Sequence, residues 1–131
     1  MKTLYLCLHI PGTYHDRSRQ NKRGLRDALS AYGECRELDY LSISPGDLHG
    51  VLYAEIVAFQ PDLLFTQIQG TDPLTADMLA RLRADFPALR VVNWNGDVWD
   101  EHLTSTDMLA ILRHVDVQLT VKATVLDTYA A

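Results

Sequence analysis

Side chains suited to binding hydroxylated molecules gather after one apolar run of the chain. The segment VVNWNGDVWDEH, residues 91–102, starts apolar and then carries two amides, several carboxylates and both tryptophans. A connecting turn calls for Asn, Gly or Asp, but it does not call for tryptophan. Amides and carboxylates bond to hydroxyl groups, and an indole offers a flat apolar face with one N–H donor. The combination favours recognition of a hydroxylated or phosphorylated small molecule.

Comparable polar groups follow the other apolar runs that we expect to be strands. In open α/β sheets, ligands bind beyond the carboxyl ends of the strands, where the strand order reverses. Polar side chains after several such runs therefore converge on one edge, where they would form a sugar-like site. The candidate substrate-binding residues are Gly12, Gln67, Gln69, Asn93, Asn95, Gly96 and Trp99.

A basic run follows the first apolar segment. Residues 15–26 read HDRSRQNKRGLR, and the candidates for contact with phosphate or another anion are Arg17, Arg19 and Arg23. A helix that begins here would favour negative charge at its N-terminus. The alternative for the same run is a solvated helix face.

Each candidate also has a structural alternative. Asn95, Gly96 and Asp97 are typical of a turn and a helix cap, and the tryptophans are typical of packing. The acidic residues and His102 that follow Gly96 fit no established ligand spacing, so no metal site is predicted. The sequence lacks the G-x-G-x-x-G and G-x-x-x-x-G-K-[ST] phosphate loops and the G-x-S-x-G nucleophile motif. The first apolar run also lacks the paired acidic residues that a receiver domain would need.

Apolar periodicity predicts five strands alternating with helices. Such alternation predicts a doubly wound, Rossmann-like α/β domain, in which a parallel five-stranded sheet has helices on both faces. The expected strands are Thr3–Ile10, Glu34–Leu41, Asp62–Gln69, Leu89–Trp94 and Val115–Val121. The first expected helix is Ser18–Tyr32, with Tyr32 on its apolar face and Gly33 as its C-cap. The third is expected to have Asp72 as its N-cap and Pro73 as its first residue, and the fourth to begin at Thr104 or Ser105. The second and last expected helices are Asp47–Gln60 and Thr124–Ala131.

The totals indicate one ordinary globular domain spanning residues 1–131. The chain is 47% hydrophobic and 22% charged, and its formal net charge is −5, so we do not expect nucleic acid as a partner. No apolar run approaches the ~20 residues of a membrane helix, and the first residues lack a clear signal-peptide cleavage site. We therefore expect a cytoplasmic protein without a membrane span. Cys7 falls in an apolar strand and is expected to be a buried thiol.

Residues 61–131 resemble the amino-terminal half of CgeB-like glycosyltransferases, which are of the GT-B type. The resemblance is carried by a P-D-L…Q segment, a helix beginning L-T, a strand ending in W-x-G-D, a V-D-x-x-L-T strand and a later tyrosine. The matching residues are Pro61-Asp62, Gln67, Leu74-Thr75, Trp94, Gly96-Asp97, Val115-Asp116, Leu119-Thr120 and Tyr129. Before residue 61 only the order of strands and helices agrees.

The resemblance implies an acceptor-side domain that faces a donor-binding domain across a cleft. Such enzymes use a nucleotide-sugar as co-substrate and need no bound metal or other cofactor. The donor-binding half is absent from this sequence, so we expect the chain to be inactive alone and to require a second Rossmann-like domain or chain. As a hypothesis, His9 or Asp97 serves as general base toward the acceptor hydroxyl, because both would lie at strand ends that converge.

The leading interpretation is therefore the acceptor-side domain of a GT-B-like glycosyltransferase that transfers a sugar from a nucleotide-sugar to a hydroxyl acceptor. The alternative is a non-catalytic α/β module that binds a small polar ligand or docks to a partner. A nucleotide-dependent enzyme of flavodoxin type is less favoured, because the segment PGTYHDRSRQ contains one glycine and few hydroxyl side chains.

Overall fold

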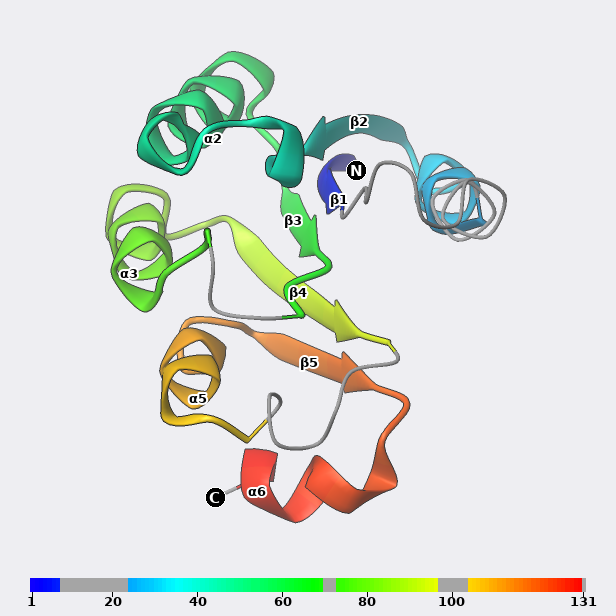
Figure 1. Cartoon of the computed structure of the whole chain (residues 1–131). Coiled ribbons are helices and arrows are strands. Elements are labelled where there is room, and N and C mark those ends of the chain that lie inside the picture. Colours follow the sequence, from blue (N-terminus) through cyan, green and yellow to red (C-terminus); the bar gives the residue numbers. More distant parts are fainter. Residues whose placement is uncertain (8–23, 70–72, 97–103, 131) are drawn as a thin grey trace.

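The protein folds around a parallel sheet with the strand order β2-β1-β3-β4-β5 (Figure 1). The computed structural model describes residues 1–7, 24–69, 73–96 and 104–130. All four strand pairings are parallel, which confirms the predicted doubly wound α/β class. The strands are β1 Lys2–Cys7, β2 Glu34–Asp39, β3 Leu63–Thr66, β4 Arg90–Asn95 and β5 Val117–Thr120.

Helices lie on both faces of this sheet (Figure 1). Helices α2 (Pro45–Phe59), α3 (Ala76–Asp85) and α5 (Thr106–Leu112) cover one face, and helical residues 24–30 lie on the other. Helix α6 (Leu126–Ala130) follows β5 at the edge of the sheet. Two 3₁₀ turns, η1 (Tyr40–Ser42) and η2 (Ala123–Val125), follow β2 and β5.

Local chemistry explains where these helices begin. Pro45 occupies the first turn of α2, where its missing N–H costs nothing. The Ser105 hydroxyl accepts from the Met108 amide and caps α5, as the sequence predicted. The predicted start of the third helix at Asp72 and Pro73 is wrong. The Thr75 hydroxyl caps α3 by accepting from the Met78 amide, so the helix begins at Ala76.

Strand ends and one helix face also differ from the prediction. β3 and β5 are four residues long, shorter than the predicted Asp62–Gln69 and Val115–Val121. Beyond Thr66 the Ile68 amide donates to the Asn93 side chain rather than to a strand backbone, so the β3 ladder stops there although β4 continues to Asn95. Tyr32, predicted on an apolar helix face, is 74% exposed because the helical residues end at residue 30. Gly33 has a φ of 147°, consistent with the predicted break after the helix.

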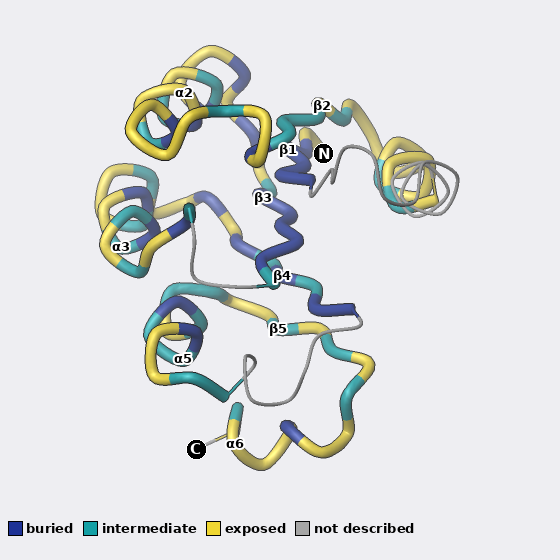
Figure 2. The backbone as a smooth tube through the Cα atoms, viewed as in Figure 1, coloured by how far each residue is buried: buried dark blue, intermediate teal, exposed yellow. Residues whose placement is uncertain are grey.

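Most of the core lies between the sheet and α2, α3 and α5 (Figure 2). Buried leucines of β1 and β3 meet Leu48 and Leu52 of α2 and Leu79 and Leu82 of α3. A smaller cluster on the other face holds Tyr5, Phe65 and the thiol of Cys7, which is buried as predicted. The two faces are therefore covered to different depths.

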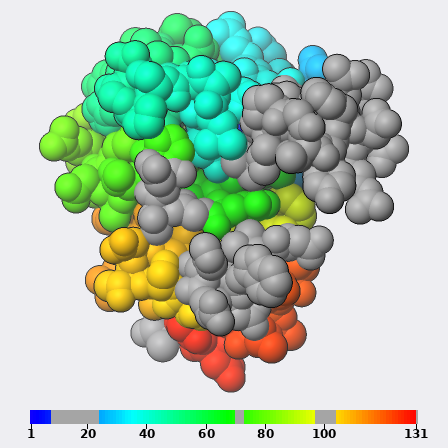
Figure 3. Space-filling model, in the orientation of Figure 1, coloured from blue at the N-terminus to red at the C-terminus, as the bar shows by residue number. Residues whose placement is uncertain are grey.

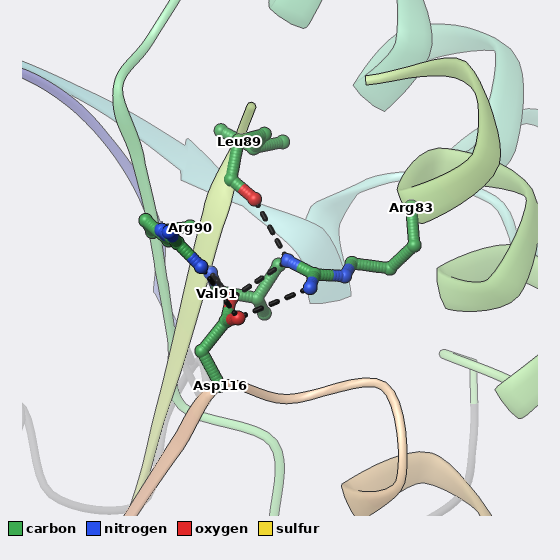
Figure 4. Close-up of polar contacts among 5 residues, drawn as sticks. All are labelled: Arg83, Leu89, Arg90, Val91 and Asp116. Carbon is green, nitrogen blue, oxygen red and sulfur yellow. Dashed lines mark hydrogen bonds and ion pairs between the residues drawn. The ribbon is translucent and has the colours of Figure 1, made fainter. Parts of the chain in front are cut away.

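A carboxylate ties the amino-terminal ends of β4 and β5 to α3 (Figure 4). Asp116 accepts two hydrogen bonds from the Arg83 guanidinium, at 2.7 and 3.0 Å, and one from the Val91 amide at 2.7 Å. Arg83 also donates to the Leu89 carbonyl at 2.8 Å, and Arg90 contacts the same carboxylate at 3.3 Å. Such bidentate pairs combine strength with fixed geometry.

These contacts set the charge state of Asp116. Burial acts to raise the pKa of its carboxyl, but the hydrogen bond from Val91 and the hydrogen bonds and charge of Arg83 outweigh burial, so the pKa lies below its ordinary value. A lowered pKa in the folded state stabilises the fold above the unfolded-state pKa, about 4. That contribution is lost as the pH falls through the lower, folded-state pKa.

We expect Asp116→Asn to lower the free energy of unfolding at pH 7 by about 1.5–3 kcal/mol, because charged hydrogen bonds become neutral or are lost. Urea unfolding followed by circular dichroism measures the change. Asp127→Asn, at an exposed position of α6, is the control and should have little effect. The difference between wild type and Asp116→Asn should begin to shrink below about pH 4, where the unfolded chain binds a proton, and should disappear once the pH is below the lowered folded-state pKa. A difference that persists at low pH would contradict this account.

Candidate functional site

The carboxyl ends of β1 and β3 meet where the strand order reverses, the usual ligand position in an open α/β sheet. Gln67 lies just beyond β3, and its backbone N–H donates to the Leu6 carbonyl at 3.1 Å. Its side-chain Oε1 accepts from the Tyr5 hydroxyl at 2.6 Å, and its carbonyl accepts from the Tyr40 hydroxyl at 3.1 Å. Gln67 is 5% exposed, and its side-chain amide is held in place by the hydrogen bond from Tyr5.

The two tyrosines act at this position as neutral donors. Burial raises the pKa of the Tyr5 hydroxyl, and the nearby Cys7, Glu37 and Cys35 side chains raise it further. Burial also raises the pKa of Tyr40, with a smaller effect from Asp39. Both hydroxyls therefore keep their protons at physiological pH, and each proton is directed at Gln67.

Asn93 is the centre of a second buried amide group, at the end of β4. Its Oδ1 accepts from the Thr66 hydroxyl and the Ile68 amide, both at 2.7 Å. Its Nδ2 lies 3.2 Å from the Ile68 carbonyl, 2.6 Å from Asn95 Oδ1 and 2.9 Å from Gln118 Oε1. Asn93 is fully buried. Because its partners Thr66, Asn95 and Gln118 belong to β3, β4 and β5, this one side chain joins the ends of three strands.

The same group extends toward the last helix. Asn95 is also fully buried, and its Nδ2 lies 3.4 Å from the Tyr129 hydroxyl on α6. Gln118 on β5 is half-buried and donates to the Leu119 carbonyl at 2.7 Å. Amides and hydroxyls thereby connect the ends of β3, β4 and β5 with the final helix.

Gly96 lies in close contact with the ring of Trp94. A Cβ placed on Gly96 would meet the Trp94 ring at 2.9 Å. The half-buried indole of Trp94 therefore extends forward along the strand and lies beside Gly96. The predicted role of Trp94 in packing agrees with its contact with the Tyr5 and Phe65 cluster.

A shallow pocket lies beside this edge, between the first turns of α3 and α5, whose atoms adjoin in Figure 3. Its volume is about 300 Å³, and its lining includes Thr75, Asp77, Asp107 and Ile111. Gln69, which follows Gln67 and Ile68, is half-buried. Among the candidate substrate-binding residues that the structure describes, Gln69 therefore presents the most accessible side chain.

The structure brings together only part of the predicted site. Gln67, Asn93, Asn95 and Gly96 lie at the carboxyl edge, as the sequence placed them, but they are buried there, and Gln69 lies beside them. Their predicted role in substrate binding stays a prediction. The other candidates lie outside the described residues: His9, Gly12, Arg17, Arg19, Arg23, Asp97 and Trp99. Their roles stay predictions. Within the described part of the chain, no group of three or more His, Cys, Asp or Glu side chains is placed to hold a metal ion.

The sequence prediction missed several partners of these amides. They are Tyr5, Tyr40, Thr66 and Gln118. One signal was available for two of them, because Thr66 and Gln118 both pair in register with Asn93 on adjacent strands. Polar residues at matching positions of neighbouring buried strands indicate a cross-strand network.

Comparisons with known proteins support the fold and no more. The chain matches no protein family and no curated protein. Among solved structures it resembles NtrX from Brucella abortus, determined in complex with ADP, with a TM-score of 0.54 and 20% identity. The match covers 98% of this chain and 25% of that chain. Within the described residues, no helix is long and apolar enough to cross a membrane.

We expect Asn93→Asp to lower the free energy of unfolding by about 2–4 kcal/mol. The substitution is nearly isosteric, but it replaces the Nδ2 donor with an oxygen that faces three acceptors in a buried place. Chemical denaturation with fluorescence detection measures the change. Gln118→Ala is the matched control and should cost less than about 1 kcal/mol, because water can reach this half-buried position. Equal losses in the two variants would show that Asn93 does not organise the edge.

Proposed function

We propose that the chain is the acceptor-side domain of a GT-B-like glycosyltransferase and binds a hydroxylated acceptor at the carboxyl edge of its sheet. The observation that carries the proposal is the buried amide network around Asn93. It fixes the ends of β3, β4 and β5 relative to one another, at the edge where open α/β sheets bind ligands. Gln69 and Asp97 follow β3 and β4 in the sequence, and the strand ends that precede them are held in fixed positions by this network.

In this proposal the buried amides position the site, and accessible groups touch the ligand. Asn93 is fully buried, and its described hydrogen bonds already go to protein atoms. Gln69 would bond to an acceptor hydroxyl through its amide. Asp97 directly follows Gly96 in the sequence, and it would take the proton from the attacking hydroxyl.

The residues that carry the resemblance to CgeB-like glycosyltransferases have structural tasks in this fold. Gly96 makes room for the indole of Trp94, Asp116 joins β4, β5 and α3, and Tyr129 reaches Asn95. The resemblance therefore supports a shared fold more directly than a shared reaction. The proposal for acceptor binding depends on the edge itself.

A ligand titration followed by backbone NMR tests the binding site. With a panel of mono- and disaccharides and nucleotide-sugars, we expect the amide signals of Gln69 and Gly96 to shift, while that of Leu89, at the opposite edge, stays fixed. Gln69→Ala should weaken binding about tenfold, equivalent to one lost hydrogen bond of about 1.4 kcal/mol. Asp85→Ala, at an exposed position near the far end of α3, is the matched control. Shifts confined to the opposite edge would contradict the site.

A turnover assay tests the proposed base. The wild-type protein and the Asp97→Asn variant are each produced in the source cells and purified in a form that transfers sugar. Asp97→Asn should lower kcat by roughly 10²–10⁴-fold and leave KM little changed, because the side-chain amide of the new asparagine cannot accept the proton. Retained turnover would remove Asp97 from the mechanism while leaving acceptor binding intact.

The second candidate function is a non-catalytic module that binds a small polar ligand. This function is favoured because the buried side chains of Asn93 and Gln67 form their hydrogen bonds with protein groups, so these bonds hold the structure together rather than acting on a substrate. This module would show the same NMR shifts at Gln69 and Gly96, but no preparation containing it would transfer sugar.

A further inference from the structure

Among the residues that the structure describes, the cover on one face of the sheet extends over only part of its width. Helices α2, α3 and α5 lie along the whole of one face (Figure 1). On the other face, the helix at residues 24–30 packs through Leu25 and Leu29 against the cluster that contains Tyr5 and Phe65. The helix therefore covers β1 and β3, on the side of the sheet nearer to β2.

Beyond that helix, the described residues leave an apolar strip that is exposed on β5 and half-buried on β4, where Val92 and Trp94 also pack against the Tyr5 and Phe65 cluster. Val92 pairs with Val117 and Trp94 pairs with Leu119, so these side chains share one face. Val117 is 47% exposed and Leu119 is 43% exposed, and Val121, the residue directly after β5, is 60% exposed. We call Val92, Trp94, Val117, Leu119 and Val121 the β4–β5 strip; Figure 2 shows exposed positions along β5.

The strip differs from scattered surface apolar residues. Single exposed apolar side chains are normal on a monomer, but here they adjoin along two paired strands. All-parallel sheets are found almost only with both faces covered. The opposite edge strand, β2, contains Glu34, Arg36, Glu37 and Asp39, whereas β5 contains no charged residue. The apolar character is therefore specific to the β4–β5 side.

The dimensions and charge of the strip indicate what fits on it. Two neighbouring strands span about 10 Å, which matches the diameter of one α-helix. Arg90 stands on the same face as Val92 and Trp94 by strand alternation, and it is exposed at the amino-terminal end of β4. Its side chain is 72% exposed, and its partner Asp116 is already held by two bonds from Arg83. A cation therefore marks one end of an uncharged strip.

We propose that the β4–β5 strip is the docking surface for an amphipathic α-helix of a partner polypeptide. The helix would lay an apolar stripe on the strip and place an acidic side chain beside Arg90. Helix-in-groove recognition of this kind depends on apolar residues at i, i+3, i+4 and i+7. This inference does not rest on acceptor binding, because the strip lies on a face of the sheet and the proposed ligand edge lies at the strand ends.

Labelled peptide helices test the proposal with the intact chain. The probes are an 18-residue amphipathic peptide with a leucine stripe and flanking glutamates, the same peptide with flanking lysines, and a scrambled peptide of the first composition. Binding is measured by fluorescence anisotropy. We expect the glutamate peptide to bind and the scrambled peptide to bind at least tenfold more weakly.

Two variants and one control locate the binding. Leu119→Lys should weaken binding of the glutamate peptide at least tenfold, while Val57→Lys, at a 53% exposed position on α2, should leave it unchanged. Arg90→Glu should reverse the preference between the glutamate and lysine peptides. Circular dichroism checks that each variant is folded, which the exposure of all three positions favours.

Other occupants of the strip appear as distinct results. A dimer in sedimentation experiments that Leu119→Lys dissociates would replace the partner helix with a second copy of the chain. Binding to lipid vesicles that the same variant abolishes would replace it with a membrane surface. Equal binding of the scrambled peptide, or binding that Leu119→Lys leaves unchanged, would also overturn the proposal.

Discussion

The arrangement of the carboxyl edge depends on the complete burial of one amide, that of Asn93. A buried amide needs hydrogen-bond partners, because an unpaired polar group in the interior costs free energy that no neighbouring contact returns. Asn93 meets this need with groups from β3, β4 and β5 and with the backbone of Ile68. Since these partners come from different strands, one side chain fixes their relative positions, and the segments leaving the strands inherit that order.

The two ends of the sheet are held by different chemistry. At the amino-terminal end, the Asp116 carboxylate collects charged donors, so the contact depends on pH. At the carboxyl end, neutral amides and the protonated hydroxyls of Tyr5 and Tyr40 carry the connections. A neutral network keeps its form over a wide pH range.

Much of the fold could be predicted from sequence, because alternating apolar runs specify a parallel sheet with helices between its strands. The position of Asn93 and Asn95 at a strand end was also predictable. Their burial was not, since the same letters are typical of turns. The cap of α3 at Thr75 rather than Asp72 was missed because both residue types cap helices well and the sequence offers both just before the same apolar stripe. The role of Asp116 required three-dimensional contacts with Arg83 and Val91.

Native-state hydrogen exchange at the Ile68 amide tests the central claim most directly. Ile68 lies beyond the end of β3, and its amide donates to Asn93 Oδ1 at 2.7 Å. If Asn93 organises the edge, this amide should exchange as slowly as the amides within β3, which open only with the core. Exchange at the fast rate of an exposed loop amide would contradict the account, because the carboxyl edge would then open independently of the sheet.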